Sequence, residues 1–314
     1  MFNGINSVLT IFTMIGVGFF FSKKGWFSEK TQMLFSKIVV NISLPAMTVY
    51  NLKIRFTKDH LLLSIQGIAI SFASILLLYT ISLLIAKMLH LSKKKASVFS
   101  VLFTFSNTVF IGFPVIVSLF GEKSIEYALL YYLANTTLFW TLGVYKLSSY
   151  KHLESKQKFT IEPKFLKNII SPAFVSLFAG YFIVLLSIPI PQFLMDSMQY
   201  IGNLTVPLSM LFIGISFSII SPKSFKITKT LCWIAIGKFI LSPIIMFIIV
   251  SFLPFPSLMQ KVLIIEAGMP IQSQAAIVAK YYDADADFAS VAVGFSILLS
   301  LITIPVYTIL LSIL

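Results

Sequence analysis

Two apolar stretches of the chain each carry a glycine and a proline beside polar side chains. Helix-breaking proline removes one backbone N–H donor and clashes with the carbonyl four residues earlier, so each stretch predicts an interrupted helix. The interruption leaves N–H groups free, which favour an anion, and nearby amides and hydroxyls would complete its site. A pair of purely structural proline kinks is the alternative. The first stretch runs from Ser106 to Pro114 and the second from Glu266 to Gln274; their candidate binding residues are Asn107, Thr108, Gly112, Pro114, Gly268, Met269, Pro270, Gln272, Ser273 and Gln274.

Further polar residues lie inside other apolar stretches. The segment Asn41-Ile-Ser-Leu-Pro45 is similar to Asn203-Leu-Thr-Val-Pro207, so Asn41 and Asn203 either border the same site or shape the helices that hold it. Glu266 is the acidic residue that we place well inside an apolar stretch, where ionisable groups are costly and indicate function. Three interpretations of Glu266 remain open: it carries a coupling proton, it pairs with Lys238, or it reaches water at the end of its helix.

The composition sets the environment of these residues. Of 314 residues, 58% are hydrophobic and 11% are charged, and the mean hydropathy is +0.95. Soluble domains have about 25% charged residues, so the composition predicts a protein of the lipid bilayer. It excludes a soluble enzyme, a disordered chain and a secreted disulfide scaffold. We attribute the net charge of +13 to lysines between apolar stretches, which orient a membrane protein, and expect no nucleic-acid partner.

Enzymatic and metal chemistry find little support in the sequence. The single cysteine, Cys232, excludes an intramolecular disulfide and a multi-cysteine zinc site. The run from Asp283 to Asp287 begins like a calcium loop, but Phe288 stands where such a loop requires glycine. No metalloprotease or phosphate-loop sequence is present. We therefore expect no enzyme, no cofactor and no resident metal.

Long apolar runs predict an all-α integral membrane fold of ten transmembrane helices, because a helix needs about 20 apolar residues to cross a bilayer. Lysine and arginine concentrate in the odd-numbered connections, which the positive-inside rule places in the cytoplasm. We expect a multi-pass protein of the cell membrane with both termini extracellular and a cytoplasmic central loop. The ten predicted spans are residues 5–22, 33–51, 62–86, 97–119, 125–147, 168–187, 194–220, 230–252, 260–280 and 288–312.

Similar segments recur between the halves of the chain at a nearly constant offset. The Asn-x-x-x-Pro segments of spans 2 and 7 are 162 residues apart, and the Gly-x-Pro segments of spans 4 and 9 are 156 residues apart. Recurrence in the same order indicates a duplication. Each half has five spans, an odd number, so the second half must enter the membrane in the opposite sense. We expect repeats at 1–147 and 168–314, joined by a loop at 148–167.

These residues resemble the auxin efflux carrier family, which includes plant auxin carriers and bacterial malate-permease-like proteins. The similarity is most specific in Ser106-Asn107-Thr108 with Gly112 and Pro114, in Gly268-Met269-Pro270, and in Leu44-Pro45. The resemblance implies two inverted five-helix repeats, with a scaffold of spans 1, 2, 6 and 7 that forms a homodimer. It also implies a moving transport domain of spans 3–5 and 8–10, in which broken spans 4 and 9 cross at Pro114 and Pro270. Asn107 matches an asparagine of the family's substrate site.

The leading hypothesis is a secondary transporter that moves an organic carboxylate, either an auxin-like weak acid or a malate-like dicarboxylate. Alternating access of an elevator type would carry this small organic anion, with proton or sodium coupling. One alternative is a sodium-coupled symporter of the bile-acid type, which also crosses two broken helices. A channel or a membrane-embedded sensor is an alternative from a different class.

Overall fold

The computed structural model describes residues 2–55, 60–148, 172–219 and 227–313. In these ranges the chain is helical, and its extended backbone pairing is a single isolated β-bridge between Ser106 and Ile271. The predicted central loop, 148–167, and the start of the sixth predicted span lie almost entirely outside the described residues.

The helices of the first half follow the apolar runs, with short polar or glycine-containing connections between them. Several are interrupted by π-helical turns, labelled η, which insert an extra residue into a turn of helix. The elements are α1 (Phe2–Lys23), α2 (Glu29–Ile38), η1 (Val39–Ser43), α3 (Leu44–Arg55), α4 (His60–Met88), α5 (Lys93–Thr104), η2 (Thr108–Gly112), α6 (Phe113–Phe120), the 3-10 turn η3 (Glu122–Ser124), α7 (Ile125–Leu138) and η4 (Phe139–Gly143).

The second half has the same alternation of long and interrupted helices. The chain bends at Asn203 between α11 and α12 and is interrupted after Ala267. Its elements are α10 (Pro172–Leu185), α11 (Gln192–Gly202), α12 (Thr205–Ile219), α13 (Lys229–Ile236), η6 (Gly237–Leu241), α14 (Ser242–Ser251), α15 (Ser257–Ala267), α16 (Gln274–Tyr281) and α17 (Ala286–Ile313).

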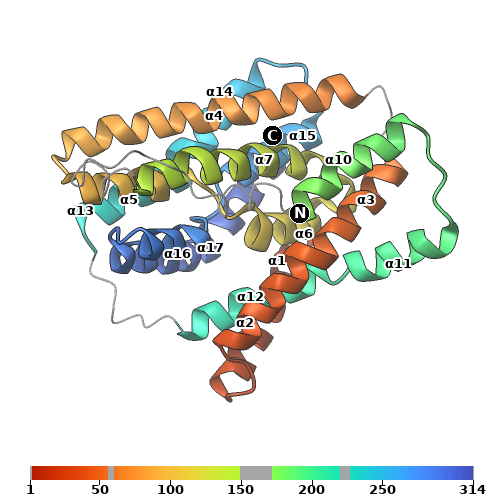
Figure 1. Ribbon diagram of the computed structural model, residues 1–314, viewed down its shortest axis with the longest axis horizontal. Coiled ribbons are helices and arrows are strands. Elements are labelled where there is room, and N and C mark those ends of the chain that lie inside the picture. Colours follow the sequence, from red (N-terminus) through yellow and green to blue (C-terminus); the bar gives the residue numbers. More distant parts are fainter. Residues whose placement is uncertain (1, 56–59, 149–171, 220–226, 314) are drawn as a thin grey trace.

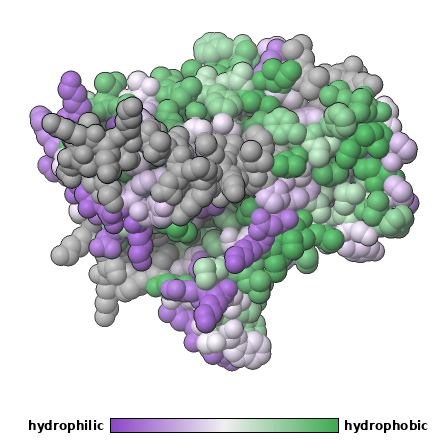
Figure 2. All heavy atoms as spheres, viewed as in Figure 1, coloured by the Kyte–Doolittle hydropathy of each residue, from purple (hydrophilic) through white to green (hydrophobic). Residues whose placement is uncertain are grey.

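Five helices of the described residues are long and apolar enough to cross a membrane, judged by length and composition. They span Glu29–Ile54, Leu63–Met88, Gln192–Ile219, Lys229–Ser251 and Ala286–Leu311, and shorter apolar helices accompany them. Many large apolar side chains remain exposed, and Figure 2 shows apolar residues over the upper and right-hand parts of one face. Such an extended apolar surface is that of a protein embedded in lipid. The all-helical membrane fold is thus confirmed, while the count of ten spans and the inverted repeat stay predictions.

The helices pack in two groups, which are distinguishable in Figure 1. In the first group α1 packs on α12, and α3 packs on both α10 and α11. In the second group α4 packs on α5, α7 and α14, α14 packs on α15, and α16 packs on α17. Most of the largest fully buried side chains come from α4, α5, α7 and the residues next to the break between α5 and α6, among them Phe103, Phe105 and Phe113. The core of the molecule therefore surrounds this break.

Candidate functional site

The two interrupted helices meet at their breaks. After α5 ends at Thr104, residues 105–107 are extended, and they run antiparallel to residues 270–272. The Asn107 N–H donates to the Pro270 carbonyl at 2.7 Å, and the Gln272 N–H donates to the Phe105 carbonyl at 3.1 Å. Backbone groups that lose their helical partners need new ones away from water. Each break therefore satisfies the backbone groups of the other.

The position of the first break differs from the expectation. Span 4 is interrupted as predicted, but the prediction that it crosses at Pro114 is wrong, because the break lies at residues 105–107. Pro114 lies in the first turn of α6, where the missing N–H costs little. In the other helix, Gly268 and Pro270 lie within the break itself. The bridge pairs Ser106 with Ile271, so Gly268–Pro270 lies at the crossing and Gly112–Pro114 lies beyond it. The two Gly-x-Pro segments therefore do not occupy equivalent places, although their similarity predicts that they do.

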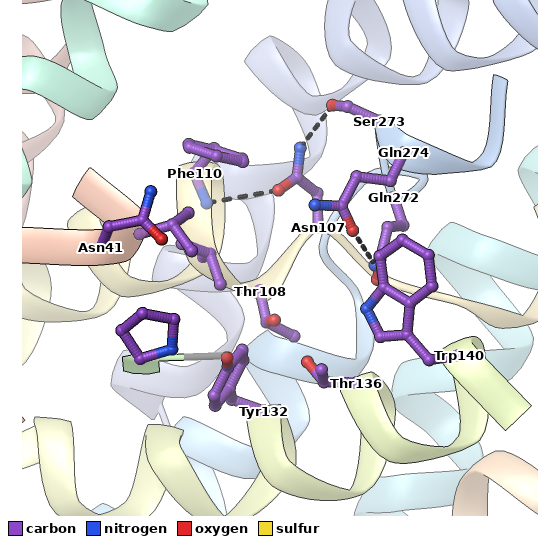
Figure 3. A pocket seen from close by; sticks show the side chains of 13 residues that line it. Asn41, Asn107, Thr108, Phe110, Tyr132, Thr136, Trp140, Gln272, Ser273 and Gln274 are labelled. Atoms are coloured by element: carbon purple, nitrogen blue, oxygen red, sulfur yellow. Dashed lines mark hydrogen bonds between the residues drawn. The ribbon is translucent and has the colours of Figure 1, made fainter. Parts of the chain in front are cut away.

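Asn107 joins the crossing to the start of the following helix. Its side-chain oxygen accepts a hydrogen bond from the Phe110 N–H at 3.2 Å, as an N-cap residue does. Its side-chain amide donates to Ser273 Oγ at 2.8 Å, across the crossing (Figure 3). Ser273 immediately precedes α16. The N-terminal ends of both second half-helices are therefore held close together, and the first N–H groups of each lack intrahelical partners.

Asn135 of α7 fixes the crossing from the side. Its side-chain oxygen accepts from the Ser106 N–H at 3.0 Å, and its amide donates to the Ser106 carbonyl at 2.9 Å. The same amide donates to Gln272 Oε1 at 2.9 Å. Asn135 is fully buried, so no water competes for these hydrogen bonds. The Gln272 amide in turn donates to Gln274 Oε1 at 3.1 Å, which continues the chain of amides.

A cavity of about 190 Å³ opens beside the crossing. It lies between the two groups of helices, since η1 and Pro172 of α10 form one wall and the crossing, α7 and η4 form the others. Figure 3 shows amide and hydroxyl side chains around this cavity, with the aromatic rings of Phe110, Tyr132 and Trp140 between them. Its lining residues are Val40, Asn41, Asn107, Thr108, Val109, Phe110, Tyr132, Thr136, Trp140, Pro172, Gln272, Ser273 and Gln274. We refer to this cavity as the central pocket.

Among the residues that the structure describes, the lining of the central pocket carries no charged side chain. Polar contacts there come from neutral groups: the amides of the crossing, hydroxyls, and the backbone of two helix starts. A second cavity, of about 220 Å³, shares Ser273 with the central pocket and runs between α2, α12, α16 and α17. It reaches Glu29 and Gln32 at the start of α2. The crossing therefore borders two adjoining cavities.

The structure brings half of the predicted binding residues into the pocket. Asn41 also lines it, from η1, where its amide donates to the Lys37 carbonyl at 2.9 Å. Asn203, its counterpart in the repeat, is exposed between α11 and α12 and does not line the described pocket. The residues that lie in the lining are Asn41, Asn107, Thr108, Gln272, Ser273 and Gln274, and those outside it are Gly112, Pro114, Asn203, Gly268, Met269 and Pro270.

Glu266 and Lys238 are both completely buried next to the crossing. Burial excludes the interpretation that Glu266 reaches water at a helix end. The Lys238 ammonium donates to the carbonyl of Thr104, the last residue of α5, at 2.9 Å. The Glu266 carboxylate packs against Gly112, where an added Cβ would lie 2.8 Å from Glu266 Cδ. Lys238 and Glu266 therefore lie beside the ends of the half-helices, outside the central pocket.

Sequence reasoning missed Asn135 together with Tyr132, Thr136 and Trp140. The polar run Asn135-Thr136-Thr137 inside span 5 was the available signal, because polar side chains in a membrane helix need partners. The aromatic residues gave no such signal, since rings are common throughout this chain.

Comparison with known proteins agrees with this architecture. Residues 3–308 match the membrane transport protein family. An uncharacterized transporter of Methanocaldococcus jannaschii is 26% identical over 310 residues, which cover 96% of each chain. An uncharacterized transporter of Methanothermobacter thermautotrophicus is 23% identical over 308 residues, which cover 97% of each chain. The match over nearly the whole chain confirms the resemblance to auxin efflux carriers, and the protein belongs to the membrane transport protein family.

Proposed function

We propose that this protein is a secondary transporter that moves an organic carboxylate through the central pocket by alternating access. The observation that carries the proposal is the crossing itself, where two helix starts and the Asn107 amide face one cavity. Helix N-termini favour anions because their N–H groups are unpaired and the helix dipole is positive there. Broken helices that meet in this way are a recurrent substrate site of secondary transporters.

The composition of the pocket favours a carboxylate with one charge and an apolar body. A dicarboxylate would bring a second charge into a lining whose described side chains include no cation, whereas Trp140, Tyr132 and Phe110 suit an aromatic or aliphatic body. A cavity of about 150 Å³ holds a benzene molecule, so about 190 Å³ has room for a small ring acid. Among the two expected substrate classes, an auxin-like weak acid therefore suits this lining better than a malate-like dicarboxylate.

The boundary between the two helix groups supports an elevator-type movement. Asn41 and Pro172 come from the α1–α3 and α10–α12 group, while the other polar lining residues come from the group that contains the crossing. A rigid shift of the second group against the first would carry the site across the membrane. The division into repeats 1–147 and 168–314, the homodimer formed by the scaffold helices and the sidedness of the termini belong to this proposal.

Reconstituted transport tests the proposal. Purified protein in liposomes is loaded with unlabelled carboxylates of varied size, and counterflow of radiolabelled malate and of a radiolabelled aromatic acetate is measured. Asn107→Ala removes the amide that caps Phe110 and contacts Ser273, so we expect kcat/KM to fall by about tenfold or more. Asn203→Ala is the matched control, because this exposed amide lies outside the pocket.

Each component of the proposal has its own contrary result. Wild-type kinetics in Asn107→Ala would refute the assignment of the site. Strict dependence on sodium would favour a symporter of the bile-acid type, and currents far above carrier rates would show a channel. Binding of a carboxylate without any counterflow would indicate a sensor.

A further inference from the structure

Glu266 is a buried acid with no hydrogen-bond donor among the residues that the structure describes. Both of its carboxylate oxygens are inaccessible and unpartnered. Lys238, the neighbouring cation, directs its ammonium to the Thr104 carbonyl instead of to Glu266. An ionised carboxylate without donors is very unfavourable inside a protein and inside a membrane, whereas a protonated carboxyl group is tolerated. The observed arrangement is therefore that of a neutral Glu266.

The groups around Glu266 come from four elements. Lys238 from η6 and Tyr131 from α7 both lie within electrostatic range of the carboxyl group. Tyr307 from α17 packs over Gly268, two residues farther along the chain, and donates to the Phe239 carbonyl at 2.6 Å. Gly112 at the end of η2 provides the remaining wall and has no side chain to donate a hydrogen bond.

We refer to the buried space around the Glu266 carboxyl group as the chamber. It suits a proton better than a metal cation. The described residues hold no group of three or more metal-binding side chains, and Glu266 is the one carboxylate of the chamber. A sodium ion would need several oxygen ligands and would be repelled by the Lys238 ammonium beside it. A proton requires a single carboxylate oxygen, and its departure leaves a charge that the ammonium can balance.

We propose that Glu266 binds the proton that accompanies the carboxylate, and that Lys238 is the positioning partner that stabilises Glu266 after the proton leaves. This inference rests on the proposed transport function. In each cycle one proton from bulk water joins a carboxylate oxygen on one side of the membrane. The same proton leaves to bulk water on the other side, with no other bond made or broken. A singly charged carboxylate and one proton together make the transport step electrically neutral.

Hydrogen bonds connect the proton site to the central pocket. Ionised Glu266 competes with the Thr104 carbonyl for the Lys238 ammonium, and Thr104 directly precedes the crossing residues 105–107. The residue after Glu266, Ala267, accepts hydrogen bonds through its carbonyl from Ser106 Oγ at 3.2 Å and Ser242 Oγ at 2.8 Å. Ser106 is bonded to Asn135, which holds Gln272 in the pocket lining. Protonation therefore acts on both ends of the crossing.

Infrared spectroscopy of the purified protein tests proton binding without any substrate. We expect a protonated-carboxyl band that persists at neutral pH in the wild type and is absent from Glu266→Gln. Glu122→Gln is the matched control, because Glu122 lies in the η3 turn and is partly exposed. The band should be unchanged in this control. Absence of the band from the wild type, or its persistence in Glu266→Gln, would overturn the proposal.

Transport in proteoliposomes provides the second arm, with malate and an aromatic acetate as probes. The amide introduced by Glu266→Gln imitates the neutral acid and cannot release a proton, so we expect pH-gradient-driven net uptake to fall about tenfold or more, whereas Glu122→Gln should retain wild-type uptake. Wild-type dependence on the pH gradient in Glu266→Gln contradicts the proposal. If the variant does not fold, the protonated-carboxyl band of the wild type and the dependence of its uptake on the pH gradient still decide. Wild-type protein that shows the band but no counterflow of either probe refutes the transport function and leaves the proton site standing.

Discussion

At the scale of single residues, Asn135 pairs with backbone groups of Ser106 that a neighbouring strand would pair with in a sheet. Ser106 has backbone groups that neither the helix nor the antiparallel bridge pairs on that side, and one side-chain amide serves both of them. A primary amide can accept and donate at the same time, which no hydroxyl or carboxylate does with the same geometry. This explains why a buried asparagine is found on a helix that otherwise packs apolar side chains and rings.

Replacing Asn135 by alanine should weaken both the fold and the site. Each Ser106 backbone group left unpaired costs about 1–3 kcal/mol, and Gln272 loses the donor that orients it. We expect a lower melting temperature in detergent and a higher KM for the transported carboxylate. Thr141→Ala is the control, because the Thr141 hydroxyl contacts carbonyls of its own helix. An unchanged melting temperature in Asn135→Ala would show that other groups hold the crossing.

Part of the site could be predicted from residue types. Asn107, Gln272, Ser273 and Gln274 were visible as polar side chains beside helix breakers, and they line the pocket. The break of span 4 lies earlier than predicted, because Phe105-Ser106-Asn107 contains no glycine or proline. Its backbone is kept extended by pairing with Ile271 and by Asn135, both distant in sequence. Long-range hydrogen bonds of this kind leave no local signal in the chain.

At the scale of elements, π-helical turns lie where the helices meet the site. Asn41 belongs to η1, Thr108 and Phe110 belong to η2, and Trp140 belongs to η4, and all of them line the central pocket. Lys238 belongs to η6. A π turn inserts one residue and shifts the helical register, so the helix can direct an additional side chain toward the pocket without ending. Long apolar runs predicted these helices but could not show their inserted residues.

Close contact between α1 and α12 should depend on two glycines. A Cβ on Gly214 would lie 2.6 Å from the Phe19 nitrogen and 2.8 Å from Gly18 Cα, and these are backbone atoms that cannot move aside. Gly214→Ala should force the helices apart and cost about 1–3 kcal/mol, seen as a lower melting temperature and less folded protein. Gly16→Ala on α1 should leave stability unchanged, because nothing lies within 4 Å of its added methyl group. Equal stability of both variants would contradict this packing.

At the scale of the whole molecule, corresponding contacts recur between the halves. Gly18 and Gly180 match at an offset of 162 residues; a Cβ on Gly18 would meet Leu211 and Gly214 of α12, and one on Gly180 would meet Leu52 of α3. Leu52 and Gly214 are themselves 162 residues apart. Helix α1 thus packs on α12 as α10 packs on α3, and such reciprocal packing is what the predicted duplication would produce.

If the halves are inverted repeats, as proposed, corresponding connections lie on opposite sides of the membrane. The connection between α4 and α5 corresponds to that between α14 and α15, and both have exposed residues at Lys93 and Ser257. Because the chain has one cysteine, Cys232→Ser gives a cysteine-free background for Lys93→Cys and Ser257→Cys. The lysine distribution predicts that Lys93 lies in the cytoplasm. A membrane-impermeant maleimide should therefore label Ser257→Cys in intact cells, and Lys93→Cys only after the cells are opened. Labelling of both variants from the same side would mean that the halves are parallel. Exchange of conformation between inverted halves could not then expose the site to the two sides in turn.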